Sequence, residues 1–350
     1  MSLPTTQKLY RIFKREGIEN LELHSNEPVP QTLLRNQVLV RLRAASLNFR
    51  DVLVVTGKYP SNFPSDGLIP LSDGAGEVVA IGENVKEFKV GDRVAGIFTQ
   101  DWVNGEMKDE YMTNVLGGSA HGVLSQYRVF EKHSIVKIPQ ILSYEEAATL
   151  PCAALTAFHA LYENGIKPVG AGQTVLVLGT GGVSVFAIQF ALASGATVIV
   201  TSSNDEKLKK AIELGAHHTI NYSTTPNWDE KVRELTNGRG VDHVIEVGGS
   251  GTLQKSLKAV RRNGQVHMIG VLSKNTDPNF DVGMQVLFGG SILRGFIVGS
   301  REMFENMNRV IEQHKIHPVV DKVFKFEEAK EALHHLLSQK HVGKVVISIE

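Results

Sequence analysis

The middle of the chain alternates two hydrophobic patterns. Short β-branched apolar runs bounded by turn residues indicate buried parallel strands, and the segments between them repeat apolar residues at helical spacing. This alternation predicts an α/β domain built on a doubly wound parallel sheet. The expected strands are 174–179, 196–201, 218–221, 241–247, 264–270 and 291–298, as many as a complete dinucleotide-binding fold has. The expected helices are 182–194, 204–214, 227–236, 251–261 and 282–289.

The two ends of the chain follow a different pattern. The first 140 residues hold short β-rich runs such as Val38–Ala44 and Gly76–Ile81, which predict a compact, mostly antiparallel β domain. The tail after residue 298 is too small to be a domain, so we expect it to return to the first one. Its expected elements are helices at 301–314 and 326–338 and strands at 319–324 and 343–349. The domain assignment is therefore 1–150 with 299–350, and 151–298 as an inserted dinucleotide-binding domain.

A glycine-rich turn joins the first strand of the inserted domain to its helix. Gly179, Gly181 and Gly182 form the turn, Val183 starts the helical spacing, and Ser184 stands where a third glycine is usual. Backbone N–H groups at such a helix start bind a pyrophosphate, and the helix dipole favours its charge. Glycine turns also join strands to helices for structural reasons alone. The strand–turn–helix–strand context nevertheless predicts a dinucleotide site.

The end of the second strand bears on which dinucleotide binds. An NAD-type site places an acid there for the ribose 2′-hydroxyl, but this strand runs into Ser202. Asp205 and Glu206 follow, yet Ser203 with Glu206 matches a capping box, so both acids are expected to begin the next helix. The Ser202 and Ser203 hydroxyls and the Lys207 ammonium can receive a 2′-phosphate. The sequence therefore favours NADP(H), with Lys207 on a solvated helix face as the alternative interpretation.

Composition and charge narrow the class of protein. The chain has 350 residues, 42% of them apolar and 21% charged, which suits a globular protein of two domains. Lys+Arg and Asp+Glu both number 37, so no charge excess predicts binding to nucleic acid or to a membrane surface. Apolar runs are too short for a membrane span, and Met1–Arg15 has no signal-peptide core, so we expect a cytoplasmic protein. The single cysteine, Cys152, excludes an internal disulfide.

An ordered set of short motifs connects the chain to a known family. Together they make it resemble the medium-chain dehydrogenases/reductases, in the branch of quinone oxidoreductases and zinc-free alcohol-dehydrogenase-like proteins. The resemblance spans nearly the whole chain and implies a GroES-like, mostly β catalytic domain, a Rossmann domain, and a homodimer formed through the strand at 291–298. Besides the glycine turn, the motifs are Leu47–Asp51, Ser72–Glu77, Val90–Val94, Ala147–Pro151, Leu155–Ala157, Leu214–Ala216, Ile220–Tyr222 and Gly343–Val346.

The same resemblance raises the question of a metal. Many relatives bind a catalytic zinc through two cysteines and a histidine. Here the first cysteine position falls in 45–48, which holds no thiol, and the histidine position is Ser72, followed by Asp73. Of the three ligand positions, only the last still holds a ligand residue, Cys152. The loop at 99–120 lacks the cysteines that bind a second, structural zinc in some relatives. A catalytic zinc needs three protein ligands, so we expect no metal.

Three residues are candidates for the chemistry because of the motif positions they hold. Asn48 either binds a carbonyl oxygen or caps local backbone. Tyr59 either donates a hydrogen bond or proton from its phenol or packs in a turn. Asp73 either relays a proton, with a pKa raised by burial, or braces the backbone.

Other positions are expected to bind the cofactor. By resemblance, Thr156 bonds the nicotinamide amide and Tyr222 flanks the 2′-phosphate. Lys344 reaches the pyrophosphate from the returning tail or is a strand-edge lysine. Gly248, Gly270 and Val271 follow the fourth and fifth strands, whose carboxyl ends meet ligand in a parallel sheet.

The expected chemistry follows from the expectation that no metal is bound. Without a Lewis acid, hydride must reach a carbon made electrophilic by conjugation, while hydrogen-bond donors stabilise the charge on the remote oxygen. The sequence thus predicts an NADPH-dependent, zinc-independent reductase of activated double bonds or quinones, acting on a small carbonyl, enone or quinone substrate. The alternatives are an NADP-dependent alcohol/aldehyde dehydrogenase-like enzyme and an NADPH-binding structural or RNA-interacting protein. The balanced charge argues against RNA binding.

Overall fold

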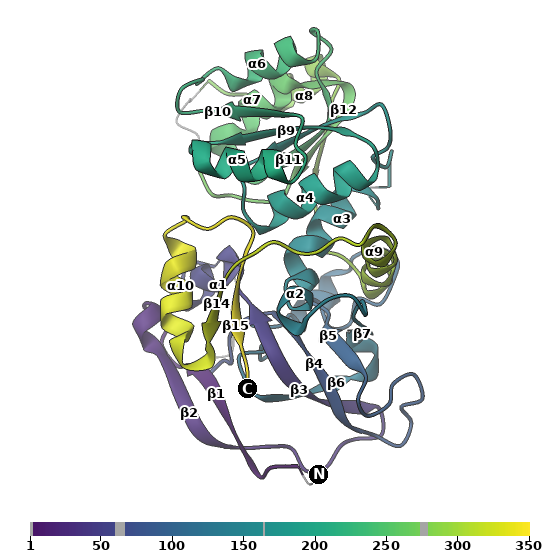
Figure 1. The fold of residues 1–350 in the computed structure, drawn as a ribbon, viewed down its shortest axis with the longest axis vertical. Helices are drawn as coiled ribbons and strands as arrows, with labels where there is room; N and C mark the ends of the chain where they lie inside the picture. Colours follow the sequence, from purple (N-terminus) through teal and green to yellow (C-terminus); the bar gives the residue numbers. More distant parts are fainter. Residues whose placement is uncertain (1–2, 60–66, 164, 274–278) are drawn as a thin grey trace. The chain divides into compact units, whose positions relative to one another are not determined.

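The computed structural model describes residues 3–59, 67–163, 165–273 and 279–350 (Figure 1). The chain divides into two compact units: unit 1 is Met1–Leu155 with Val298–Glu350, and unit 2 is Thr156–Ile297. The tail therefore folds with the first part of the chain. Among the helices in the described ranges, none has the length and apolar character needed to cross a membrane.

Unit 2 is built on a six-stranded parallel sheet with strand order β10-β9-β8-β11-β12-β13. The chain order reverses at β8, which has β9 on one side and β11 on the other. Figure 1 shows α4 and α5 on one face of this sheet and α6, α7 and α8 on the other. The strands are β8 (Thr174–Leu178), β9 (Thr197–Ser202), β10 (His218–Asn221), β11 (Val241–Glu246), β12 (Val260–Met268) and β13 (Ile292–Gly295). The helices are α3 (Leu155–Leu161), α4 (Gly182–Ala193), α5 (Asp205–Glu213), α6 (Trp228–Leu235), α7 (Ser250–Ala259) and α8 (Val282–Gly289).

The hydrophobic pattern explains these elements. Every residue of β11 is buried, as in a central strand covered by helices on both faces. Helix α4 is apolar around most of its circumference and buries most of its residues. Helix α5 is amphipathic and buries only Leu208 and Ala211, so its charged face meets solvent.

For unit 2 the predicted fold class is confirmed. The start of one strand and the cap of one helix differ from the prediction. Strand β12 begins at Val260 rather than 264 because Val260 pairs with Val241 before a register shift. The capping box at Ser203 is wrong. Asn204 is the N-cap of α5, and its Oδ1 accepts from the Lys207 N–H at 3.1 Å. The two acids do lie in the first turn, as expected.

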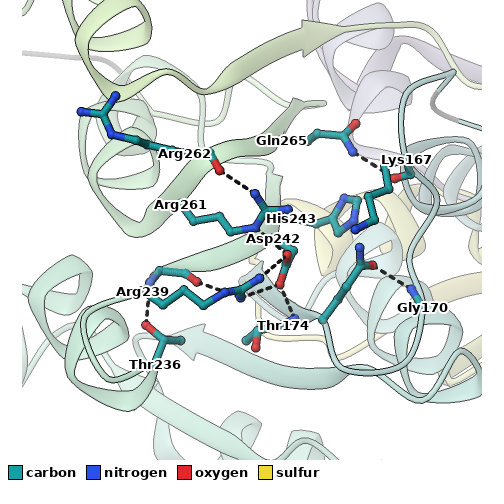
Figure 2. A network of polar contacts seen from close by, with 12 residues as sticks. Lys167, Gly170, Thr174, Thr236, Arg239, Asp242, His243, Arg261, Arg262 and Gln265 are labelled. Carbon is teal, nitrogen blue, oxygen red and sulfur yellow. Dashed lines mark hydrogen bonds and ion pairs between the residues drawn. The ribbon is translucent and has the colours of Figure 1, made fainter.

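A polar network braces the amino ends of two central strands (Figure 2). Asp242 accepts two hydrogen bonds from the Arg239 guanidinium, at 2.8 and 2.9 Å, and one from Arg261 Nε at 2.6 Å. It also accepts from the Thr174 N–H at 2.9 Å, which ties β11 to β8. Burial acts to raise the pKa of Asp242, but these bonds lower it below its usual value. This end of the sheet is therefore fixed by ion pairs, and the carboxyl ends carry the expected cofactor residues.

Unit 1 is mostly antiparallel β, as predicted. One sheet has the strand path β14-β15-β3-β4-β5-β7, with β6 paired to β3, and β1 and β2 form a separate pair. Among the strand pairs that the described part of unit 1 contains, β14–β15 alone is parallel. The strands are β1 (Thr6–Ile12), β2 (Leu21–Pro28), β3 (Gln37–Ser46), β4 (Asp73–Ile81), β5 (Arg93–Gly96), β6 (Tyr127–Glu131), β7 (Ile135–Lys137), β14 (Val320–Lys325) and β15 (Lys344–Ser348). The helices are α1 (Phe49–Val55), α2 (Tyr144–Ala147), α9 (Arg301–His314) and α10 (Ala329–Leu337).

The register of three strands gathers polar residues at one corner of unit 1. Ser46, at the end of β3, pairs with Asp73 at the start of β4 and with Val346 in β15. The Leu47 N–H then donates to the Val345 carbonyl at 3.0 Å. The residues that follow β3 and those that begin β4 and β15 therefore lie next to one another. We call the group formed by Asn48, Asp51, Ser72, Asp73, Cys152 and Lys344 the Asn48 cluster.

Candidate functional site

The expected cofactor residues of unit 2 gather at one edge of its sheet. Because β9, β8, β11 and β12 are parallel neighbours, their carboxyl ends lie at the same edge. The structure thus brings together most of the positions predicted from sequence. Gly179–Val183 follow β8, Ser202 and Ser203 lie at the end of β9, Tyr222 follows β10, Gly248 follows β11, and Gly270 and Val271 follow β12. Thr156 lies apart from these turns in sequence, buried in the first turn of α3.

The glycine turn has the geometry that an anion requires. Gly179 has a φ of +73°, which favours glycine, and its N–H donates to the Thr201 carbonyl at 2.8 Å. Gly181 is the N-cap of α4, and no described side chain caps this helix. A Cβ added to Gly181 would meet no described atom within 4 Å, so the space in front of the turn is open. Ser184, in place of the third glycine, donates from Oγ to the Leu178 carbonyl at 2.8 Å. The turn therefore fits a pyrophosphate.

The end of β9 lacks an acid, and the two acids nearby are engaged elsewhere. Asp205 accepts from the Asn221 side-chain amide at 2.7 Å, and Glu206 pairs with Lys209 at 2.7 Å. The Tyr222 N–H donates to the Ser202 carbonyl at 3.0 Å, which places Tyr222 beside the end of β9. The four residues expected around a 2′-phosphate (Ser202, Ser203, Lys207 and Tyr222) thus include no carboxylate.

Glu246 is a residue that the sequence reasoning missed. It ends β11 with a fully buried carboxylate that accepts from the Gly248 and Gly249 N–H groups at 2.8 and 2.9 Å. The Thr252 hydroxyl donates to it at 2.6 Å, and the Ser256 hydroxyl donates as well. Burial raises the pKa of Glu246 against the effect of these bonds. Glu246 holds the turn that carries Gly248, and the signal for it was an acid at the end of an apolar run.

The Asn48 cluster forms the second group of expected site residues. Lys344 is 3% exposed, and its Nζ donates to the Leu47 carbonyl and to Asn48 Oδ1, each at 2.6 Å. Asn48 Nδ2 lies 3.5 Å from Ser72 Oγ. The Lys344 ammonium therefore bonds inside unit 1, a contact that no sequence pattern indicated.

Asp73 is completely buried beside this ammonium. Its Oδ1 accepts from the Ser72 hydroxyl at 2.6 Å, and its Oδ2 accepts from the Cys152 N–H at 3.2 Å. Lys344 Nζ lies 4.0 Å from Oδ2. Burial raises the pKa of Asp73, and the Lys344 charge opposes that rise. Both oxygens already hold protein donors, so this geometry favours the bracing interpretation over a proton relay.

Tyr59 packs against the first turn of α1. The Arg50 guanidinium lies 5.1 Å from the centre of the Tyr59 ring and 4.9 Å from that of Phe98. Arg50 Nη1 donates to the Leu116 carbonyl at 3.0 Å and lies 3.9 Å from Asp51 Oδ1. Arg50 thus links the Tyr59 ring to the Asn48 cluster through Asp51.

The Asn48 cluster does not fit a catalytic zinc. Over the described ranges, no group of three or more His, Cys, Asp or Glu residues is placed to hold a metal ion. Asn48 Oδ1 is taken by an ammonium, and both oxygens of Asp73 accept hydrogen bonds. Cys152 is the only thiol of the chain, and burial and the Asp73 charge raise its pKa.

Asp51 makes the stability of unit 1 depend on pH. Its Oδ2 accepts from the Asn48 N–H at 2.8 Å, while its buried Oδ1 has no hydrogen-bond partner among the described residues. Burial raises the pKa of Asp51 from 3.8 to about 6, although Arg50 acts to lower it. The folded protein thus holds this proton more tightly than the unfolded chain. The resulting stabilisation is complete below pH 3.8 and is lost as pH rises through about 6.

We therefore expect Asp51→Asn to flatten the pH dependence of stability. Between about pH 5 and 7.5, the free energy of unfolding of the wild type should fall by about 1–2 kcal/mol more than that of the variant, measured by urea unfolding. Asp109→Asn, which changes an exposed acid, should keep the wild-type dependence. Identical pH profiles for Asp51→Asn and the wild type would contradict the assignment.

Models of known protein families match residues in both units. Residues 35–140 match the alcohol dehydrogenase GroES-like domain, and residues 182–313 match the zinc-binding dehydrogenase family. A zinc-type alcohol dehydrogenase-like protein of Schizosaccharomyces pombe is 47% identical over 336 residues, covering 95% of this chain and 96% of that protein. The human quinone oxidoreductase is 30% identical over 274 residues, covering 77% of this chain and 75% of that enzyme.

A solved structure is similar to this chain over nearly its whole length. The crystal structure of a protein of Sinorhizobium meliloti 1021 superposes with a TM-score of 0.91 at 38% identity, covering 99% of this chain and all of that one. The chain belongs to the medium-chain dehydrogenase/reductase superfamily. It is therefore an NAD(P)-dependent oxidoreductase that acts on small molecules.

Proposed function

We propose that this protein is an NADPH-dependent, zinc-independent reductase of activated double bonds or quinones. The observation that carries this proposal is the composition of the Asn48 cluster. Where zinc-dependent relatives need metal ligands, this chain holds an amide, a hydroxyl, a carboxylate with both oxygens bonded, and an ammonium. These groups can hold and donate hydrogen bonds, but they do not supply a Lewis acid. Hydrogen-bond donors suit an acceptor whose negative charge develops on an oxygen remote from the reduced carbon.

Each residue then has a defined task. The cofactor, when bound, supplies a hydride to the electrophilic carbon of the acceptor. Asn48 donates from Nδ2 to the acceptor oxygen, and the Tyr59 phenol is a second donor and the candidate proton source. Asp73 keeps the Ser72 hydroxyl and the Cys152 backbone in place.

The proposed preference for NADPH over NADH rests on the side chains at and near the end of β9. Ser202, Ser203, Lys207 and Tyr222 offer hydroxyls and a positive charge, and the adjacent acids are bonded to Asn221 and Lys209. A 2′-phosphate therefore meets no free carboxylate from these two acids. The pyrophosphate is assigned to Gly179–Val183 and the nicotinamide amide to Thr156. Gly248, Gly270 and Val271 complete the cofactor edge.

An NADP-dependent alcohol/aldehyde dehydrogenase-like enzyme is the second candidate, because the Schizosaccharomyces pombe relative is named a zinc-type alcohol dehydrogenase-like protein. A cofactor titration followed by an acceptor panel separates the two. We expect a lower KM for NADPH than for NADH, and NADPH oxidation with simple enones and quinones in the presence of a zinc chelator. Rapid turnover of saturated ketones or aldehydes, with none of enones or quinones, would instead support the second candidate.

We also propose that the enzyme is a homodimer joined through β13 and α8 of unit 2. Strand β13 is the last strand of its sheet, and α8 buries none of its residues although it is almost wholly apolar. An apolar helix beside an open sheet edge indicates an interface. Leu287, on α8, is 70% exposed.

Leu287→Asp should therefore convert the dimer to a monomer. A carboxylate in the centre of an apolar interface cannot be desolvated without a large cost. Analytical ultracentrifugation would measure the mass. Leu34→Asp is the matched control, since Leu34 is also 70% exposed but lies in unit 1, and this variant should stay dimeric. A monomeric wild type, or a dimeric Leu287→Asp, would refute the proposed interface.

A further inference from the structure

The Lys344 ammonium is the positive charge of the Asn48 cluster. It reaches this position because β15 lies between β14 and β3, so that the start of β15 meets the end of β3. At 3% exposure the ammonium has left bulk water, and it is bonded to the Leu47 carbonyl and to Asn48 Oδ1 at 2.6 Å. Two of its three N–H groups are thus used within unit 1.

This contact fixes which way the Asn48 amide faces. An ammonium donates hydrogen bonds and accepts none, so the Asn48 atom that it touches must be the oxygen. Asn48 Nδ2 must then face away from Lys344, and it lies 3.5 Å from Ser72 Oγ. The Ser72 hydroxyl gives its own proton to Asp73, which leaves its oxygen as an acceptor. The Asn48 amide therefore directs its N–H groups, and not its oxygen, away from Lys344.

The same charge strengthens that donor. The ammonium on Oδ1 polarises the amide and makes its N–H groups better donors, an effect that is larger in a low dielectric. The buried Asp73 carboxylate, with its Oδ2 4.0 Å from Nζ, balances the charge. The cluster is therefore an ordered chain from carboxylate to ammonium to amide oxygen.

We propose that Lys344 is a positioning residue for the reduction, which locks Asn48 as a hydrogen-bond donor for the carbonyl oxygen of the acceptor. This inference rests on the proposed reductase function. It differs from the expected role of Lys344 at the pyrophosphate, because a pyrophosphate ligand would act on cofactor affinity. A positioning residue acts on the rate at saturating cofactor.

A double-mutant cycle distinguishes these roles. The variants are Lys344→Met, Asn48→Ala and their combination, assayed with an enone at saturating NADPH. We expect Lys344→Met to lower kcat about 100-fold, as misplacement of a donor does, with the KM for NADPH within about threefold of the wild type. The double variant should be no slower than Asn48→Ala alone, because Lys344 acts through Asn48. Lys340→Met, at an exposed lysine of the same tail, should match the wild type.

A second measurement, of the Asn48 side-chain amide itself, does not depend on enzymatic activity. In nitrogen-15 NMR spectra, the side-chain amide of Asn48 is identified by the signals that vanish in Asn48→Ala. Its protons should exchange slowly in the wild type and at least about tenfold faster in Lys344→Met, because the amide is then released. If Lys344→Met does not fold, Lys344→Gln takes its place in both experiments, with the same outcomes expected.

Three results would overturn the inference: a raised KM for NADPH with unchanged kcat, additive losses in the double variant, or unchanged exchange of the Asn48 amide. A wild type that is inactive with every conjugated acceptor would refute the proposed function instead. The NMR comparison would then still decide whether Lys344 fixes Asn48.

Discussion

Gly181→Val should weaken NADPH binding by about 100-fold, or about 2.7 kcal/mol, without lowering the melting temperature of the protein. The glycine has a φ of −76° and a ψ of −175°, which a valine adopts without strain. Its added Cβ meets no described atom within 4 Å. The folded protein thus has room for the side chain. The same space is where a pyrophosphate must approach the N–H groups at the start of α4.

Gly170→Val is the matched control for this prediction. Gly170 also has open space around an added Cβ, but it precedes β8, whereas Gly181 follows it. Fluorescence titration with NADPH should give wild-type affinity for Gly170→Val and a large loss for Gly181→Val. Equal affinities in the two variants would show that the cofactor does not use the glycine turn.

Asn48→Asp should lower kcat by about 100- to 1,000-fold, the range measured when a single oxyanion donor is removed. The aspartate keeps an oxygen for the Lys344 ammonium, so the cluster retains its contact at 2.6 Å. It has no N–H to donate, and its charge repels the oxygen on which negative charge develops. The KM for NADPH should stay within about twofold of the wild type, because the change acts on the acceptor.

Steady-state kinetics with an enone would test this expectation. Asn36→Asp makes the same chemical change at an exposed position of unit 1 and should leave kcat unaltered. A kcat near the wild-type value in Asn48→Asp would show that Asn48 takes no part in the reaction. The Tyr59 phenol would then be the remaining donor of the proposal.

The sequence predicted the parallel sheet of unit 2 because β-branched runs separated by helical spacing have few other solutions. The strand–turn–helix–strand context likewise located the glycine turn, which depends only on local spacing. The start of α5 was wrong by one residue because Ser203 and Asn204 are both good caps. In the structure Asn204 is the N-cap: its backbone is extended and its side chain accepts from the Lys207 N–H.

The Asn48 cluster could be predicted only in part. Motif positions pointed to Asn48 and Asp73, but the contact between Lys344 and Asn48 joins residues 296 apart in sequence. That contact depends on β15 pairing with β3, a long-range register that local patterns do not encode. The burial that decides the roles of Asp73 and Lys344 arises from the same pairing. Glu246 was missed for a similar reason, since its bonds form only when the turn after β11 closes on it.

In the proposed reaction, hydride reaches a conjugated carbon without the help of a metal. Its most direct test uses NADPH deuterated at the transferable C4 position, a simple enone, and protein shown by elemental analysis to be free of zinc. We expect a saturated ketone with one deuterium at its β-carbon, formed at the same rate with and without added zinc. An allylic alcohol with deuterium at the former carbonyl carbon, or activity that rises in proportion to added zinc, would contradict it.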